Sequence, residues 1–338
     1  MSNPKTSGVA PLISGVPSAF VRGTVCRRMN VIVRFLFVFA IVARPFLNAE
    51  EASKPEPFGP GDHTRTFTVD GILRTYMAHV PPGYVEGKPT PVVLALHGAA
   101  MNGLMMVGFT GLDATADKAG FIVVYPSGTG VGPFRTWNAG GFPGGSNKTD
   151  DVAFLGKVLD DVTALATVDT KRIFACGMSN GGMMSYRLAA EMSDRIAAIA
   201  PVAGTIAIDE SKPVRPVPVL HFHGTKDTLV PYEMPQRRNP QIMRLKSVTE
   251  SIQTWVKLNG CQETPVSDVL TKAGDKMPVT RTVYSGGKNG AEVGLITIEG
   301  GGHTWPGKKS PVGFIGASTL NISANDLMWE FFQRHPMK

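Results

Sequence analysis

The sequence predicts an α/β fold in which helices cover both faces of a mostly parallel central sheet. Apolar runs at Pro91–Gly98, Phe121–Gly128 and Ile173–Cys176 have the composition of strands that are buried on both faces. Segments with apolar residues at helical spacing lie between such runs, as in residues 151–167. Alternation of this kind favours parallel strands joined by crossover helices.

The first 49 residues are expected to form a leader peptide. They contain six of the 34 basic residues and none of the 27 acidic ones, so most of the net charge of +7 lies outside the predicted domain. We therefore expect no nucleic-acid partner. The apolar run Val31–Ala43 follows the basic pair Arg27–Arg28 and is too short for a comfortable membrane span, which is typical of an export signal.

This leader predicts a secreted or periplasmic protein without stable membrane association after cleavage. Cleavage is expected near Ala49, and Met29, two residues before the apolar run, is the expected true start. A retained membrane anchor is the alternative. The sequence indicates no oligomeric state.

Residues 50–62 are rich in proline, glycine and charge and are expected to form a linker, followed by one catalytic domain at residues 63–338. A hairpin is predicted around Asp70-Gly71. Later strands are expected at 172–177, 196–204, 218–224, 280–284 and in 293–303, and later helices after Ser179 and at 248–258 and 324–334. Residues 127–150 form the longest stretch without predicted structure, and we expect a lid or a binding wall there.

Ser179 lies in a turn between an apolar strand and a helix. It is flanked by Gly177, Gly181 and Gly182 in the pattern Gly-x-Ser-x-Gly, which is frequent by chance and also suits a simple tight turn. In this context the pattern matches the nucleophile elbow of α/β-hydrolases, which raises the hydroxyl above the sheet beside helix N-terminal N–H groups. We therefore predict an α/β-hydrolase fold with Ser179 as the nucleophile.

An acid and then a base should follow the nucleophile, each after a later strand. Asp227 follows the strand at 218–224, and His303 follows three glycines after the strand that begins at Val293. His303 is predicted to take the serine proton, and Asp227 to hold the imidazole tautomer. Asp227 could instead cap a turn, and His303 could be structural, but the chain order and the elbow together favour a triad.

The oxyanion site needs a second N–H from the loop after an early strand. The segment after the strand at Pro91–Gly98 provides it, with the N–H groups of Ala99 and Asn180 as the predicted pair. His97 is expected to position substrate rather than to act as a second base. Trp137 and Trp305 are expected to form an acyl or sugar platform, with core packing as the alternative.

No metal or other cofactor is predicted. His221 and His223 form a His-x-His pair on one face of a strand, but no carboxylate or cysteine accompanies them at metal-ligand spacing. His223 is expected instead to brace the acid loop. Cys176 is expected to be a small buried hydrophobe, and no disulfide is predicted for Cys261.

The segments "GMSNGGMMSYRLA", "HFHGTKDTLVPY" and "IEGGGHTWPG" resemble the polyhydroxybutyrate depolymerase and feruloyl esterase group of secreted α/β-hydrolases. "RTYMAHVPPGY", "PVVLALHGAA", "RTWNAGG" and "DDVAFL" also fit its pattern, so the resemblance spans residues 65–334. It implies ester hydrolysis through an acyl-serine intermediate. Members of this group often carry a cysteine near residues 285–287 that could pair with Cys261; it is absent here, as are the cysteines common after the Trp-Asn-Ala-Gly stretch.

The resemblance predicts a secreted serine carboxylesterase. Its substrate would be a feruloyl or acetyl side-chain ester of plant polysaccharide, or a short hydroxyalkanoate ester. Two alternatives stay open: a peptidase on the same fold, and a polymer-binding protein with an inactive triad.

Overall fold

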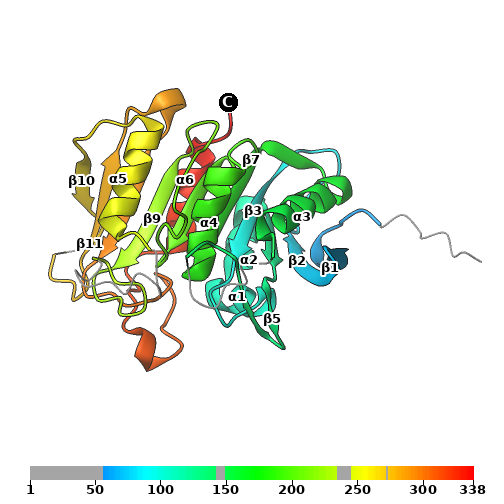
Figure 1. Ribbon diagram of the computed structural model, residues 1–338, viewed down its shortest axis with the longest axis horizontal. Helices are drawn as coiled ribbons and strands as arrows, with labels where there is room; N and C mark the ends of the chain where they lie inside the picture. The colour runs from blue at the N-terminus through cyan, green and yellow to red at the C-terminus, as the bar shows by residue number, and fades with distance from the viewer. Residues whose placement is uncertain (1–55, 142–148, 234–244, 272) are drawn as a thin grey trace, which may run out of the picture. The chain divides into compact units, whose positions relative to one another are not determined.

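Figure 1 shows the computed structural model, which describes residues 56–141, 149–233, 245–271 and 273–338. The chain divides into a unit Met1–Ser53 and a unit Lys54–Lys338. The leader, its cleavage site and the start at Met29 therefore lie outside the described residues, and the description below concerns the second unit.

A ten-stranded sheet forms the centre of the domain, with the order β1-β2-β4-β3-β7-β8-β9-β12-β11-β10. The strands from β4 to β12 in this order are parallel, and the pairs at both edges are antiparallel. Their bounds are β1 Gly61–Val69, β2 Ile72–Val80, β3 Thr90–Leu96, β4 Ile122–Pro126, β7 Val168–Met178, β8 Ala198–Val202, β9 Val219–Gly224, β10 Val266–Val269, β11 Val279–Tyr284 and β12 Val293–Ile298. The predicted, mostly parallel sheet is confirmed.

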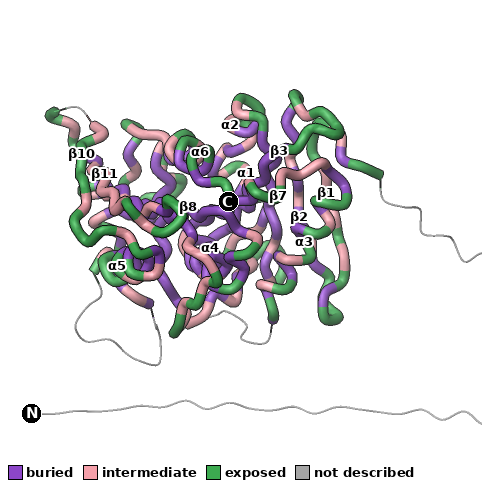
Figure 2. Tube along the Cα trace, turned by 90° about the horizontal axis from the view of Figure 1, so that it is seen from above, coloured by how far each residue is buried: buried purple, intermediate pink, exposed green. Residues whose placement is uncertain are grey.

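Helices cover both faces of the sheet, as Figures 1 and 2 show. One face packs against α3 (Asp151–Leu165), α4 (Asn180–Glu191) and α5 (Val248–Asn259); the other packs against α1 (Gly103–Thr110), α2 (Leu112–Ala119) and α6 (Ala324–Arg334). Strand β3 shows why: Val92, Leu94 and Leu96 belong to one core, whereas Val93 and Ala95 belong to the other. Side chains that alternate along a strand fill two separate cores, so both sets must be apolar.

The start of the domain differs from the prediction. Phe58 is buried and its N–H donates to the Leu165 carbonyl at 2.7 Å, and β1 begins at Gly61, so residues expected to be linker already join the fold. The predicted hairpin forms around Asp70 and Gly71, which both have positive φ as a tight two-residue turn requires.

Several elements had no sequence prediction. Helices α1 and α2 were missed because α1 has no clear apolar face and Gly111 interrupts the pattern. Strand β10 is a short, fully exposed edge strand without a hydrophobic signature. The expected lid region begins instead with a two-stranded hairpin, β5 (Thr129–Val131) and β6 (Phe134–Thr136). Short 3-10 turns occur at η1 (Lys288–Gly290) and η2 (Gly313–Ile315).

Over the described part of the chain, no helix is both long and apolar enough to cross a membrane.

Candidate active site

Ser179 sits at the corner between β7 and α4, with φ 56° and ψ −119°. A non-glycine residue with positive φ is strained, and such strain is tolerated where the surroundings hold it in place. The Ser179 N–H donates to the Val202 carbonyl at 2.8 Å, and the Ser179 carbonyl accepts from the Met183 N–H at 2.9 Å. The serine is partly exposed, so its hydroxyl is accessible at the carboxyl ends of the parallel strands.

Gly181 explains why the elbow needs glycine after the serine. A Cβ at this position would overlap the Leu96 carbonyl oxygen and would lie 2.6 Å from the His97 carbonyl oxygen. The first turn of α4 therefore packs directly against the backbone that ends β3. This contact brings the loop after β3 to the elbow: a Cβ on Gly98 would lie 3.6 Å from the Ser179 Cβ.

Asp227 and His303 meet at the carboxyl edge of the parallel sheet, where the Ser179 corner also lies. His303 Nδ1 lies 2.7 Å from Asp227 Oδ2, and both side chains are almost completely buried. The other carboxylate oxygen, Oδ1, accepts the backbone N–H groups of Leu229 at 2.9 Å and Val230 at 2.8 Å. Two fixed donors thus hold one oxygen and leave the other aimed at the imidazole.

The loops that carry these two residues are joined through their backbones. The Lys226 N–H donates to the Gly301 carbonyl at 2.8 Å, and the His303 N–H donates to the Ile315 carbonyl at 2.7 Å. A Cβ on Gly224, at the end of β9, would overlap the Gly301 carbonyl. The glycines that surround the histidine in the sequence therefore permit close backbone contact between two strand-end loops.

Ser179 Oγ makes no hydrogen bond to His303 within the described residues. Hydrogen bonds between catalytic groups often tighten only when substrate is bound, so a missing serine–histidine bond in the free protein does not argue against such a pair.

The predicted oxyanion donors are both free. Among the described residues, the backbone N–H groups of Ala99 and Asn180 enter no hydrogen bond. Asn180 is the first residue of α4, where the N–H groups have no partner within the helix. Ala100, with φ 60°, turns the chain directly after Ala99. Both N–H groups therefore remain available as hydrogen-bond donors.

Asn180 has a second role that the sequence did not reveal. Its side-chain Oδ1 accepts from the Trp137 N–H at 2.7 Å and from Thr136 Oγ1 at 3.0 Å, and its Nδ2 donates to the Trp137 carbonyl at 3.2 Å. Trp137 Nε1 in turn donates to the His97 carbonyl at 2.9 Å. These bonds tie the residue after the serine to the segment that leads into the Ala99 loop.

This arrangement corrects the expected roles of Trp137 and His97. Both side chains are fully buried, and their polar atoms are hydrogen-bonded within the protein, so neither lines a surface that substrate can reach. His97 Nδ1 donates to the Gly98 carbonyl at 2.8 Å, and its Nε2 accepts the Gly128 N–H at 2.9 Å. Burial lowers the pKa of His97 to about 4, so the ring is neutral and positions backbone.

Trp305 also differs from its expected place in the site wall. The indole is buried in the core beside Phe109, and Nε1 donates to Asn325 Oδ1 at 2.8 Å. Asn325 Nδ2 continues to the Thr110 carbonyl at 3.0 Å. Trp305 therefore anchors the chain two residues after His303 against α6 and α1 instead of forming a platform.

A buried ion pair supports the same region. Arg74 Nη2 lies 2.6 Å from Asp151 Oδ1, and Asp151 Oδ2 accepts the Asn138 N–H at 2.6 Å. The guanidinium stacks over the Phe154 ring at 3.7 Å, and burial lowers the pKa of Arg74. The pair fixes the backbone next to Trp137. An arginine in a hairpin strand carries no sequence signal for this contact.

The two imidazole rings of the His-x-His pair form a hydrogen bond to each other. His221 Nε2 and His223 Nδ1 lie 2.9 Å apart. Over the described residues, no group of three or more His, Cys, Asp or Glu side chains has metal-binding geometry.

Six exposed apolar side chains lie on segments that are linked to the site loops in the sequence or by hydrogen bonds; we call Leu104, Met105, Val131, Phe134, Leu229 and Phe314 the apolar rim. The hairpin with Val131 and Phe134 joins the loop after β3 through the Arg135 N–H to Met101 carbonyl bond. The Leu229 N–H donates to Asp227 Oδ1, and Phe314 directly precedes Ile315, whose carbonyl accepts the His303 N–H. Gathered in one patch, exposed apolar side chains of this kind would form a binding surface.

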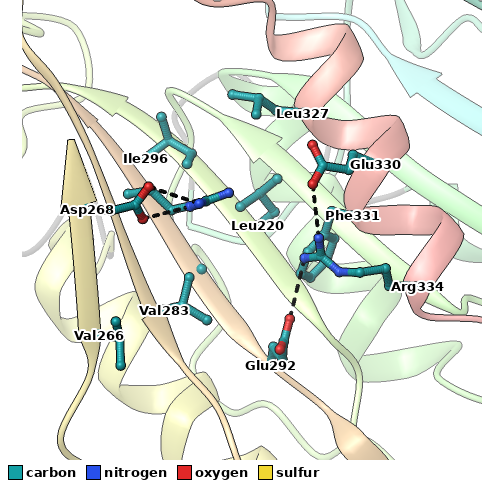
Figure 3. Close-up of a pocket in the computed structure, with 12 residues that line it drawn as sticks. Leu220, Val266, Asp268, Val283, Glu292, Ile296, Leu327, Glu330, Phe331 and Arg334 are labelled. Carbon is teal, nitrogen blue, oxygen red and sulfur yellow. Dashed lines mark hydrogen bonds and ion pairs between the residues drawn. The ribbon is translucent and has the colours of Figure 1, made fainter. Parts of the chain in front are cut away.

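A separate pocket of about 270 Å³ lies between α6 and the strands β9 to β12 (Figure 3). Its charged side chains pair with one another: Arg281 contacts Asp268 at 2.9 Å, and Arg334 contacts Glu330 at 3.2 Å. None of the residues predicted for the active site lines it. It therefore belongs to the flank of the sheet and not to the candidate site.

The two cysteines in the described residues are free. Cys176 is fully buried, as predicted, and burial raises its pKa to about 12. The Cys261 thiol faces residue 287, within the segment where the resemblance implied a cysteine, because a Cβ on Gly287 would lie 2.9 Å from its Sγ.

Comparison with known proteins shows the family. Residues 74–250 match the family described as "Esterase PHB depolymerase". "Putative esterase NocK" of Nocardia uniformis subsp. tsuyamanensis is 33% identical over 285 residues, which cover 79% of this chain and 81% of that protein. Feruloyl esterase B of Piromyces equi is 32% identical over 241 residues, which cover 68% of this chain and 42% of that protein.

A solved structure has the same fold. An acetyl xylan esterase from Aspergillus awamori superimposes with a TM-score of 0.56 and 17% identity, covering 80% of this chain and 99% of that one. At this identity the likeness concerns the fold alone. Together with the family match and the related esterases, it leads to one conclusion: the chain is a carboxylic ester hydrolase and belongs to the esterase PHB depolymerase family.

Proposed function

We propose that this esterase works through a covalent acyl intermediate on Ser179, with His303 as the general base and Asp227 as the acid that orients it. The observation that carries the proposal is the 2.7 Å contact between His303 Nδ1 and Asp227 Oδ2, at the same sheet edge as the strained Ser179 corner. A serine hydroxyl is a poor nucleophile unless a base takes its proton, and a carboxylate on Nδ1 leaves Nε2 free to do so.

The chemistry then has two halves. His303 Nε2 takes the Ser179 proton as Oγ attacks the ester carbonyl, and the resulting oxyanion accepts the N–H groups of Ala99 and Asn180. His303 returns the proton to the alcohol as it leaves, and water releases the acid from the acyl-serine by the same route. The Asn180–Trp137–His97 bonds support this step because they hold both oxyanion donors from behind.

The proposed substrates are feruloyl or acetyl side-chain esters of plant polysaccharide, or short hydroxyalkanoate esters of the polyhydroxybutyrate type. The names of the related feruloyl and acetyl xylan esterases support the first class, and the family description supports the second. The apolar rim favours an ester with an apolar or aromatic acyl part over a small acetyl group. We propose that the protein acts outside the cytoplasm, because of the predicted leader.

Turnover of p-nitrophenyl acetate by the wild type and Ser179→Ala tests the mechanism. We expect turnover in the wild type and none in the variant; unchanged turnover in Ser179→Ala would refute the assignment. A fluorophosphonate probe should label only the wild type. Polymer binding without labelling would instead support an inactive binding protein, and cleavage of aminoacyl-anilides but not esters would support a peptidase.

A substrate panel tests the specificity. Methyl ferulate, acetylated xylan and polyhydroxybutyrate should be compared at equal enzyme concentration. A higher kcat/KM for methyl ferulate or polyhydroxybutyrate than for acetylated xylan is expected from the apolar rim. A clear preference for acetylated xylan would contradict that part of the proposal.

A further inference from the structure

Three buried side chains form a hydrogen-bonded line behind the candidate triad. Tyr186 Oη lies 2.8 Å from His221 Nδ1, His221 Nε2 lies 2.9 Å from His223 Nδ1, and His223 Nε2 lies 2.8 Å from the Val230 carbonyl oxygen. All three side chains are buried, and the two imidazole rings are almost parallel, with an angle of 2° between them.

The Val230 carbonyl sets the direction of every bond in this line. A carbonyl only accepts, so His223 Nε2 must carry a proton and donate it. In a neutral ring His223 Nδ1 then accepts from His221 Nε2–H, and His221 Nδ1 accepts from the Tyr186 hydroxyl. Burial lowers the pKa of both histidines, which agrees with neutral rings.

The line joins two parts of the candidate triad. At one end, Tyr186 lies on α4, the helix that begins directly after Ser179. At the other end lies Val230, whose carbonyl accepts from His223 and whose N–H donates to Asp227 Oδ1. His223 Nε2 lies 3.5 Å from Asp227 Oδ2, the oxygen that contacts His303.

We propose that Tyr186, His221 and His223 are positioning residues that hold the acid loop so that Asp227 Oδ2 faces His303. The inference rests on the proposed triad and concerns how it is held. None of the three side chains touches solvent, so their effect passes through Asp227 and not through substrate contact. Misplacement of a catalytic group by about 1 Å can cost about 100-fold in rate, so loss of the line should lower kcat and leave KM unchanged.

A matched pair of variants at position 223 tests the role. In His223→Gln the amide Nε2 can still donate to the Val230 carbonyl, whereas His223→Leu fills a similar volume without a donor. We expect kcat to fall by about 10- to 100-fold in His223→Leu, with KM unchanged, and to recover for the most part in His223→Gln. Rates are normalised to active sites counted by fluorophosphonate titration, so a smaller folded fraction does not imitate the effect.

Equal kcat in both variants and the wild type would overturn the proposal, and so would a loss confined to KM. If His223→Leu does not fold, Tyr186→Phe decides, because it keeps the ring and removes only the hydroxyl donor. A lower kcat at constant KM is expected there, and wild-type kinetics would overturn the proposal.

Nitrogen NMR of the imidazole rings adds a readout of direction, with both His221 and His223 expected as neutral Nε2–H tautomers. An Nδ1–H tautomer at either ring would contradict the line as drawn.

Ser179→Ala in the same series separates the two proposals. Turnover in that variant would refute the proposed function, whereas an inactive Ser179→Ala together with an unaffected His223→Leu would refute only the positioning line.

Discussion

Asp227→Asn is expected to inactivate the enzyme by reversing one hydrogen bond while leaving the fold in place. The Leu229 and Val230 N–H groups both donate to Oδ1, so the new amide must put its oxygen there and turn its NH₂ toward His303. The flipped amide would leave two buried N–H groups without an acceptor, at a cost of about 1–3 kcal/mol each. The backbone N–H groups of the acid loop therefore decide how the new side-chain amide is oriented.

With an NH₂ group facing it, His303 Nδ1 must accept instead of donate, so the proton of the neutral ring moves to Nε2. A protonated Nε2 cannot take the Ser179 proton. In serine hydrolases with this type of triad, the same exchange lowers kcat by about 10⁴-fold, equivalent to about 5.5 kcal/mol of activation free energy.

The assay is kcat for p-nitrophenyl acetate at neutral pH, with thermal unfolding measured in parallel. Asp160→Asn is the matched control, because it removes an exposed carboxylate whose partner, Arg195, lies away from the site. We expect wild-type kcat in the control. A kcat for Asp227→Asn within about tenfold of the wild type, a difference of less than about 1.4 kcal/mol, would refute the reasoning about the amide and the assigned acid.

Three further outcomes and one pH effect are expected. Gly181→Ala should give little folded or active protein, because its Cβ would overlap the Leu96 carbonyl; soluble, active enzyme after expression would contradict this. Trp137→Phe keeps most of the ring packing but leaves the buried His97 carbonyl without its indole donor. It should lower the free energy of unfolding, measured by urea titration, by about 1–3 kcal/mol, and it should also lower kcat, measured by ester turnover. Phe314→Ser should raise KM for methyl ferulate more than for p-nitrophenyl acetate. The control Val214→Ser, which is at least as exposed but lies before the start of β9, should change neither KM; equal effects of the two variants would remove the argument for the apolar rim. Burial lowers the pKa of His97 from 6.5 to about 4, so as the pH falls His97 binds a proton in the unfolded chain before it does in the folded protein. The free energy of unfolding should therefore fall by up to about 3 kcal/mol as the pH drops from about 6.5 toward 4. A urea midpoint that stays constant between pH 7 and 5 would contradict this.

Local pattern was sufficient to predict most of the scaffold. The strands at β3, β4, β7 and β9 and the helices α3 to α6 follow from apolar composition and spacing, which depend only on neighbouring residues. Asp227 and His303 were found by chain order, because a parallel sheet brings the loops after successive strands to one edge. Their 2.7 Å contact agrees with that argument.

The tertiary structure decided what the aromatic and histidine side chains do. Trp305 lies two residues after His303, and Trp137 and His97 lie in segments that were expected to border the site. The structure reverses the expected platform, because all three side chains are buried and their hydrogen-bond partners come from segments up to about 40 residues away. Sequence proximity to a catalytic residue does not show whether a side chain points into the core or toward the site.

The His-x-His pair shows the same division. The sequence determined that His221 and His223 share one face of a buried strand, and that two such polar groups must find partners. Tyr186, on a different element, and the Val230 carbonyl become those partners only once α4 and the acid loop pack against β9. Spacing along a strand is local, whereas the donor or acceptor that meets each ring depends on three-dimensional packing, so only the folded chain could decide it.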